Sequence, residues 1–225
     1  MIKVRKDAIK VKTSEGMQSV GVLCKVGTFG IDHVVYATTV QFADLNLFQT
    51  PKISVRLDNL ESLEYVFKGG VINETVEEIE VFCKNKITSI ANFAEAKLSG
   101  TNNALKKLIL HVDTSNCPSF NGFVWKQTNL EEIGGSPLDC SSSIAFNLWM
   151  NNCGNLKEIR FVPNTIFANI SFSNTANLSA ESIQSIIDGL AIVETSCTLT
   201  FNSTVKAKLT EQQIATITSK NWTLA

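Results

Sequence analysis

The sequence predicts an α/β solenoid, a ladder of parallel strands closed at its C-terminal end by helical capping repeats. Three observations predict this fold. A short phrase with two apolar residues three positions apart recurs along the chain. Several copies continue into an alternation of apolar and polar residues, which is typical of a half-buried strand. The last part of the chain changes to the apolar period of a helix.

The recurring phrase is a small or polar residue, then Leu or Val, two variable residues, and Leu or Ile. Its apolar starts at residues 60, 76, 105, 130 and 156 are separated by 16, 29, 25 and 26 residues. Three of these intervals lie within, or at the edge of, the range of about 20–29 residues that defines leucine-rich repeats. We therefore predict an irregular leucine-rich repeat. Its copies are Asn59–Leu63, Thr75–Ile79, Ala104–Leu108, Asn129–Ile133 and Asn155–Ile159.

Each copy leads into a short strand that cannot bury its apolar face alone. Alternation continues in Ile79–Val81, Leu108–Leu110 and Ile159–Phe161. Stacking these strands in parallel makes one continuous core, because each copy covers the next. Aromatic residues between the strands are expected to fill the convex side of the coil; they are Phe93, Phe120, Phe123, Trp125, Phe146 and Trp149.

The stretch Asn151–Pro163 resembles the BspA-like class of bacterial leucine-rich repeats, which reads aromatic, small residues, Cys, x-Asn-Leu-x-x-Ile-x-apolar-Pro. The copy at Leu130 matches the first half of this pattern and breaks at Gly134-Gly135, and two earlier copies lack the Cys-x-Asn lead-in. The resemblance covers roughly residues 57–165. It implies a curved solenoid used for binding or display, in surface proteins and in phage or prophage structural proteins, and it implies no chemistry.

Residues 179–225 are predicted to form strand and helix capping repeats, since a solenoid needs atypical end units. Ser179 is a suitable N-cap for a helix over 179–192, and strand-like alternation follows in Thr198–Phe201. Thr210 with Gln213 forms a capping box for a second helix. Inward positions of the two helices are Ile183, Ile186, Ile187, Leu190, Ile214 and Ile217, and Trp222 and Leu224 close the chain.

Residues 1–50 lack the repeat and are predicted to form an N-terminal β cap or attachment segment, which leaves residues 51–178 as the solenoid. Short strands are indicated around Ile2, Ile9, Val20 and Val34, with glycines between them. The segment is basic, whereas residues 58–80 are acidic. These charges are either a solvated surface or complementary ends through which neighbouring molecules assemble.

Composition and motifs exclude several classes of function. A formal net charge of −1 excludes general electrostatic binding of nucleic acid or anionic lipid, and no apolar run is long enough for a membrane span. His33 and His111 have no metal-site spacing. The pairs Glu77-Glu78 and Glu131-Glu132 resemble paired catalytic carboxylates, but they occupy the variable positions of the repeat, which need only be polar. We predict no catalytic residue, metal or cofactor, and therefore not an enzyme. The six cysteines are interpreted as free buried thiols, with three disulfides as the alternative.

Candidate binding residues are the outward side chains of the strands. Glu80, Ile109, Gly134 and Arg160 fall at the middle of successive strands and are expected to form a row on the concave face. His111 follows the strand at Leu108–Leu110, where it caps the exposed edge. We take Glu80, Ile109, His111 and Arg160 as the candidate site. The residues of this row differ in charge and polarity, so they indicate no particular class of ligand.

The sequence thus predicts a non-catalytic protein-interaction or structural module, for which the resemblance implies a phage or prophage particle. The alternative is a cell-surface adhesion module that recognises a host protein or carbohydrate. A protein partner or self-assembly is expected, with carbohydrate as another ligand class. The start of the chain lacks the apolar stretch of a signal peptide. The expected location is a virion or prophage particle, or the cell surface.

Overall fold

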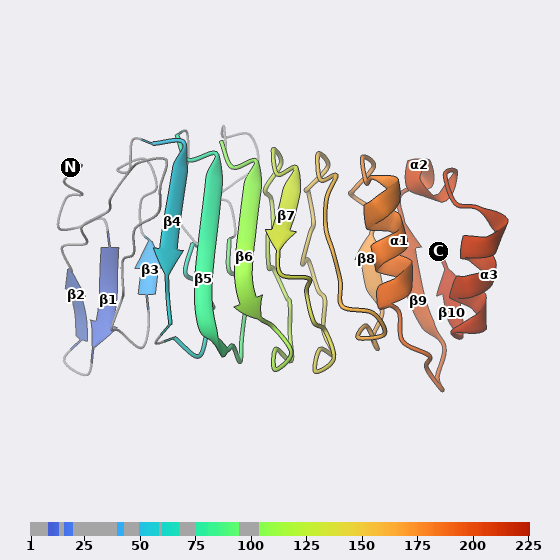
Figure 1. Cartoon of the computed structure of the whole chain (residues 1–225), viewed down its shortest axis with the longest axis horizontal. Helices are drawn as coiled ribbons and strands as arrows, with labels where there is room; N and C mark the ends of the chain where they lie inside the picture. Colours follow the sequence, from blue (N-terminus) through green and yellow to red (C-terminus); the bar gives the residue numbers. More distant parts are fainter. Residues whose placement is uncertain are drawn as a thin grey trace.

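The chain has an α/β structure in which strands lie side by side along the long axis and helices follow at the C-terminal end (Figure 1). The computed structural model describes residues 9–13, 16–19, 40–42, 50–58, 60–67, 75–94 and 104–225. The elements are β1 (Ile9–Thr13), β2 (Gly16–Ser19), β3 (Val40–Phe42), β4 (Lys52–Arg56), β5 (Glu78–Lys86), β6 (Lys107–Asp113), β7 (Glu132–Gly135), β8 (Ile170–Phe172), α1 (Ala180–Gly189), β9 (Cys197–Phe201), α2 (Ser203–Lys206), α3 (Glu211–Ser219) and β10 (Trp222–Leu224).

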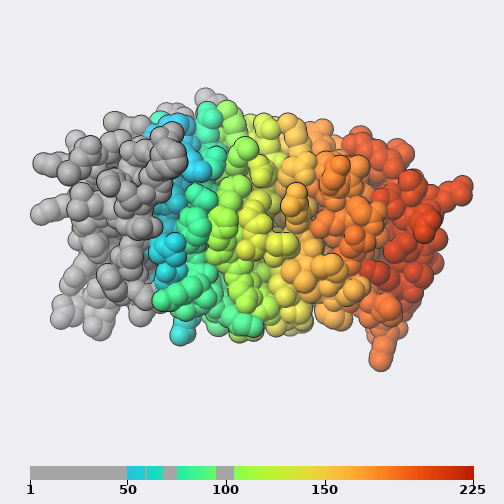
Figure 2. All heavy atoms as spheres, viewed as in Figure 1, coloured from blue at the N-terminus to red at the C-terminus, as the bar shows by residue number. Residues whose placement is uncertain are grey.

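The described strands form three sheets. Strands β2, β1 and β3 are antiparallel, whereas β4-β5-β6-β7 and β8-β9-β10 are parallel in those orders. Colour bands in Figure 2 show that the sequence advances along the long axis, so each turn of chain forms one layer beside the previous one. The predicted α/β architecture with parallel strands is confirmed. The division of the chain at residues 50 and 178 stays a prediction.

The backbone ladder corrects the predicted register of the first copy. The amides of Glu77, Lys106, Glu131 and Lys157 each donate to the carbonyl of the corresponding residue in the preceding layer, and the first of these carbonyls is that of Pro51. The residues just before these five form one buried column; they are Thr50, Val76, Leu105, Leu130 and Leu156.

The column residues at 50, 76, 105, 130 and 156 are 26, 29, 25 and 26 positions apart. The prediction that Leu60 begins the first copy in line with Val76 is therefore wrong. Leu60 lies after β4, where its carbonyl accepts a hydrogen bond from the Cys83 thiol at 3.5 Å. Thr50 is tolerated in the buried column because its hydroxyl donates to the carbonyl of Lys52 at 3.2 Å.

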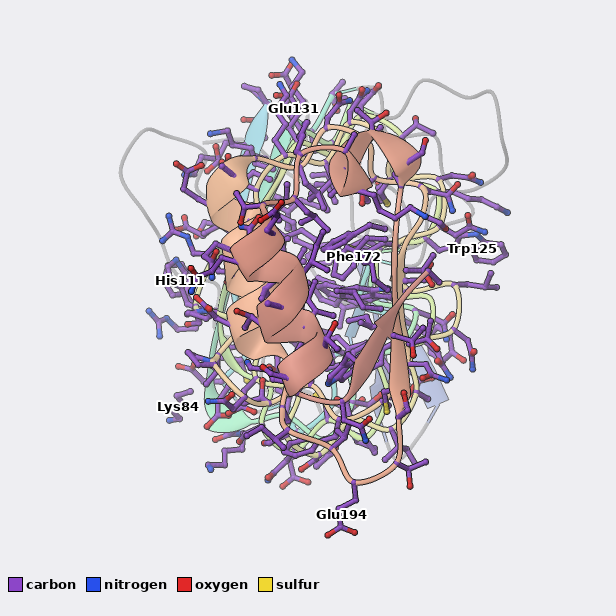
Figure 3. All side chains as sticks on the ribbon, turned by 90° about the vertical axis from the view of Figure 1, so that its right-hand side faces the viewer. Lys84, His111, Trp125, Glu131, Phe172 and Glu194 are labelled. Carbon is purple, nitrogen blue, oxygen red and sulfur yellow. The ribbon has the colours of Figure 1, made fainter. Side chains whose placement is uncertain are left out.

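Aromatic rings form a continuous column through the core, and Figure 3 looks along it with Phe172 at the centre. Neighbouring ring centroids lie 5.1–6.1 Å apart. Burial of each phenyl side chain contributes about 1.5–3 kcal/mol, and favourable ring pairs add about 0.5–1.5 kcal/mol. This aromatic core column consists of Phe67, Phe93, Phe123, Phe120, Phe146, Trp149, Phe172 and Phe201.

Five of the six aromatic residues expected between the strands are buried in this core. Trp125 is the exception: it is half-buried and projects from the side opposite His111 (Figure 3). Lys126 covers its indole ring at 3.9 Å from the centroid.

Buried thiols link neighbouring layers. The Sγ atoms of Cys117 and Cys153 donate to the carbonyls of Ile87 and Val124 in the preceding layer at 3.3 and 3.0 Å. The five cysteines of the described residues are free; Cys83, Cys117, Cys140 and Cys153 are buried as expected, whereas Cys197 is partly exposed. Cys24 lies outside the described residues.

Both predicted C-terminal helices are present, but α1 ends at Gly189 and not at residue 192, and one inward position differs. Ser179 caps α1 by accepting the Ser182 amide, and the Thr210–Gln213 capping box of α3 is present. Ile217 is buried, but Ile214, which was expected to face inward, is 42% exposed. The apolar face predicted for α3 was too wide. The helix packs on the last layer through a narrower face, and its buried residue is Ile217. The sequence did not predict α2.

The N-terminal strand expected at Ile9 corresponds to β1. The strands expected at Ile2, Val20 and Val34 lie outside the described residues.

Candidate functional site

Charges of opposite sign alternate along the outward face of the β4–β7 sheet. Lys52 pairs with Glu78 at 2.6 Å, and Lys107 pairs with Glu132 at 3.0 Å. These residues occupy one position of the register, so each strand places its charge beside that of its neighbour. Exposed pairs of this kind contribute about 0–1 kcal/mol each.

A second charged row runs beside the first. Glu77 pairs with Lys106 at 3.0 Å, and Glu131 pairs with Lys157 at 2.8 Å. The hydrogen bond from Lys157 lowers the pKa of Glu131. The adjacent carboxylates of each Glu-Glu pair therefore bind separate lysines, which accounts for them without catalysis.

An aromatic and charged cluster lies farther along the same face. The register places Arg56, Phe82 and His111 side by side on β4, β5 and β6. The His111 ring stacks on Phe82 with centroids 4.4 Å apart, and the Arg56 guanidinium lies 5.1 Å from the Phe82 centroid. Glu80 lies 3.1 Å from His111 Nε2 and 3.6 Å from Lys52 Nζ. We call Arg56, Glu80, Phe82 and His111 the Glu80–His111 patch.

The predicted site residues are only partly brought together. Glu80 and His111 are in contact, and His111 lies within β6, not after the strand as expected. Ile109 is the register partner of Glu80 on one side and of Gly134 on the other. Arg160 follows Glu158, which bridges to Glu132, so Arg160 lies two layers from Ile109. Within the described residues Arg160 forms no ion pair.

Sequence reasoning missed Phe82 and Arg56. Phe82 interrupts the alternation of β5, because an apolar side chain stands at an outward position between Val81 and Cys83, which are buried. That interruption was a usable signal. Arg56 carried none, since a charged residue is ordinary at an outward position.

The outward face of the β8–β10 sheet has a different chemistry. Its strands alternate buried apolar residues with uncharged polar ones: Ser171 on β8, Thr198 and Thr200 on β9, and Thr223 on β10. In Figure 3 these strands lie on the side opposite His111, with the aromatic core between them. The outward face of β4–β7 is thus charged, and the outward face of β8–β10 is neutral.

The described residues contain no group of three or more His, Cys, Asp or Glu side chains placed to hold a metal ion. Burial raises the pKa of the Cys117 and Cys153 thiols to about 12. Such thiols remain protonated at neutral pH and are poor nucleophiles. Across the described part of the chain, no helix has the length and apolar character needed to cross a membrane.

Comparison of the chain with protein-family models, with curated proteins and with solved structures finds no match.

Proposed function

We propose that the chain is a leucine-rich repeat solenoid that serves as a non-catalytic protein-interaction or structural module. Corresponding residues recur every 25–29 positions and hydrogen-bond to the preceding layer, as the repeat spacing requires. The buried residues of all layers from Ile53 to Trp222 belong to one cluster, so each layer is covered by its neighbours. This architecture supplies long sheet faces for contact with a partner.

The Glu80–His111 patch is the observation that carries the proposal. Phe82 is held on an outward face between a guanidinium and an imidazole, and a carboxylate that contacts the same imidazole lies beside it. Aromatic residues and arginine are enriched at protein interfaces, and tyrosine, tryptophan and arginine supply much of their binding energy. The parallel register fixes the patch rigidly, which lowers the entropy lost on binding.

The BspA-like resemblance of residues 57–165 suggests a phage or prophage particle as the setting. Five free thiols support a setting in which disulfides do not form. The alternative, an adhesion module at the cell surface, shares the same binding face.

The test measures binding of the whole chain to the purified products of neighbouring genes, by biolayer interferometry, and to itself, by concentration-dependent light scattering. Phe82→Ala should weaken the interaction about ten-fold or more. Lys107→Ala is the matched control on the same face, because it removes only an exposed ion pair; it should change affinity by less than about two-fold. Absence of both interactions, or equal binding by the Phe82→Ala variant, would refute the proposal.

A further inference from the structure

The neutral sheet face carries a groove that the Glu80–His111 patch does not involve. It is about 830 Å³ in volume and lies where the turn around Leu148 meets β8 and β9. A smaller hollow of about 190 Å³ adjoins it, and the two share Phe146, Leu148 and Ser171. Ligand sites typically have about 300–1,000 Å³, so the main groove is of suitable size.

None of the described residues that line either hollow carries a charge. This neutrality contrasts with the chain as a whole, which is 18% charged, and with the alternating lysines and glutamates of the other sheet. A charged ligand would find no counter-ion in the groove. The lining therefore selects an uncharged ligand.

Apolar side chains gather at this groove although they are exposed. Ile144, Leu148 and Phe167 are 81%, 51% and 47% exposed, and all three line it. They are half of the six large exposed hydrophobic residues in the described part of the chain. Clustered exposed apolar surface is typical of binding sites, whereas isolated residues need no explanation.

Leu148 also holds an unfavourable backbone conformation, with φ at 54°. The corresponding positions of the three preceding layers carry Tyr65, Asn92 and Gly122, at φ 64°, 51° and 64°. Asn and Gly are suited to this region, whereas Tyr65, like Leu148, is a large and partly exposed side chain there. Leu148 is thus neither buried in the core nor in a favourable backbone conformation. A ligand that packs on Leu148 would bury this side chain.

Polar groups without internal partners surround the apolar residues. Within the described residues, the Asn147 carboxamide and the hydroxyls of Thr198 and Thr200 form no side-chain hydrogen bond. Asn169 Oδ1 accepts the Thr198 amide at 2.7 Å, which leaves its NH₂ group available to donate. Amides and hydroxyls both donate and accept, as a ligand rich in hydroxyl groups requires.

We propose that this groove binds an uncharged carbohydrate chain, with Phe167 and Leu148 packing against the C–H faces of sugar rings and Asn147, Asn169 and Thr198 bonding to sugar hydroxyls. The inference is independent of the Glu80–His111 patch, which would bind a protein. Adjacent hollows that share Leu148 fit consecutive sugar units better than a single small molecule.

The test uses neutral hexasaccharides of glucose, mannose and N-acetylglucosamine, with a uronic acid oligosaccharide as the charged comparison, and isothermal titration calorimetry of the whole chain. One neutral sugar should bind with a Kd of about 1 mM or tighter, and the charged one should not. Phe167→Ala and Asn147→Ala should each weaken binding about five-fold or more. Ile192→Ala, 76% exposed and outside the groove, is the matched control and should change affinity by less than about two-fold.

Cys197 gives a second readout because it lines the groove and is partly exposed. In a Cys24→Ser background, the bound sugar should slow alkylation of Cys197, and Phe167→Ala should remove this protection. Failure of every neutral sugar to bind, binding that Phe167→Ala leaves intact, or occupation of the groove only by a protein would overturn the inference. Those outcomes leave the Phe82→Ala experiment unaffected.

Discussion

Replacing Trp149 by alanine tests whether the aromatic core column holds adjacent layers together. The indole lies between Phe146 and Phe172, at 5.4 and 5.1 Å, and its Nε1 donates to the carbonyl of Ser171 in the next layer at 2.9 Å. Truncation of a buried tryptophan costs about 3–5 kcal/mol through lost burial and the cavity. A domain has only about 5–15 kcal/mol in total, so Trp149→Ala should lose a large fraction of the free energy of unfolding.

Trp149→Phe separates the two contributions. It keeps a ring between the same neighbours and removes the hydrogen bond and part of the buried area, so we expect a loss of about 1–2 kcal/mol. Urea titrations followed by far-ultraviolet circular dichroism give the free energies of unfolding. Ile144→Ala, at an exposed site, should stay within about 0.5 kcal/mol. If Trp149→Ala lost less than about 2 kcal/mol, or if Trp149→Phe matched the exposed control, the rings would not be coupling the layers.

Three further predictions concern backbone, thiols and acid stability. Gly135 has φ at 87°, and an added Cβ would meet the backbone of the neighbouring strand, so Gly135→Ala should lose about 2 kcal/mol or more in urea; an unchanged midpoint would contradict this. Mass spectrometry after alkylation of the native protein should find Cys197 modified before Cys153, whose pKa burial raises to about 12; equal rates would refute the burial argument. Glu131 has a lowered pKa because Lys157 bonds to it, so its contribution to stability is present above about pH 4.3, the unfolded value, and is lost as the pH falls. Glu131→Gln should therefore lose less stability on acidification than the unaltered chain, and equal slopes in acid titration would argue against it.

Periodic features were predictable because they depend on a local pattern. Alternation in Ile79–Val81 and Leu108–Leu110 predicted β5 and β6, whereas the strand predicted at Ile159–Phe161 is reduced to isolated bridges at Glu158 and Phe161. The cap residues Ser179 and Thr210 predicted the starts of α1 and α3. Each of these features is decided by neighbours within a few positions, which the sequence displays directly.

Register and surface geometry were harder to predict. Thr50 occupies a position of the buried column at which the repeat pattern expects Leu or Val. Because Leu60 matches that pattern and Thr50 does not, the first copy was assigned to Leu60. The neutral groove was missed altogether. It combines residues from different layers, such as Leu148, Phe167 and Thr198, which are 19 and 31 positions apart, and no local pattern relates them.

The alternating row Glu77, Lys106, Glu131 and Lys157 limits how such a chain can change length. Duplication of one layer would set two like charges beside each other in adjacent layers, which is unfavourable. Duplication of two successive layers would restore the order of signs at both junctions. Expansion or contraction of the gene that preserves this alternation of charge would therefore add or remove an even number of layers.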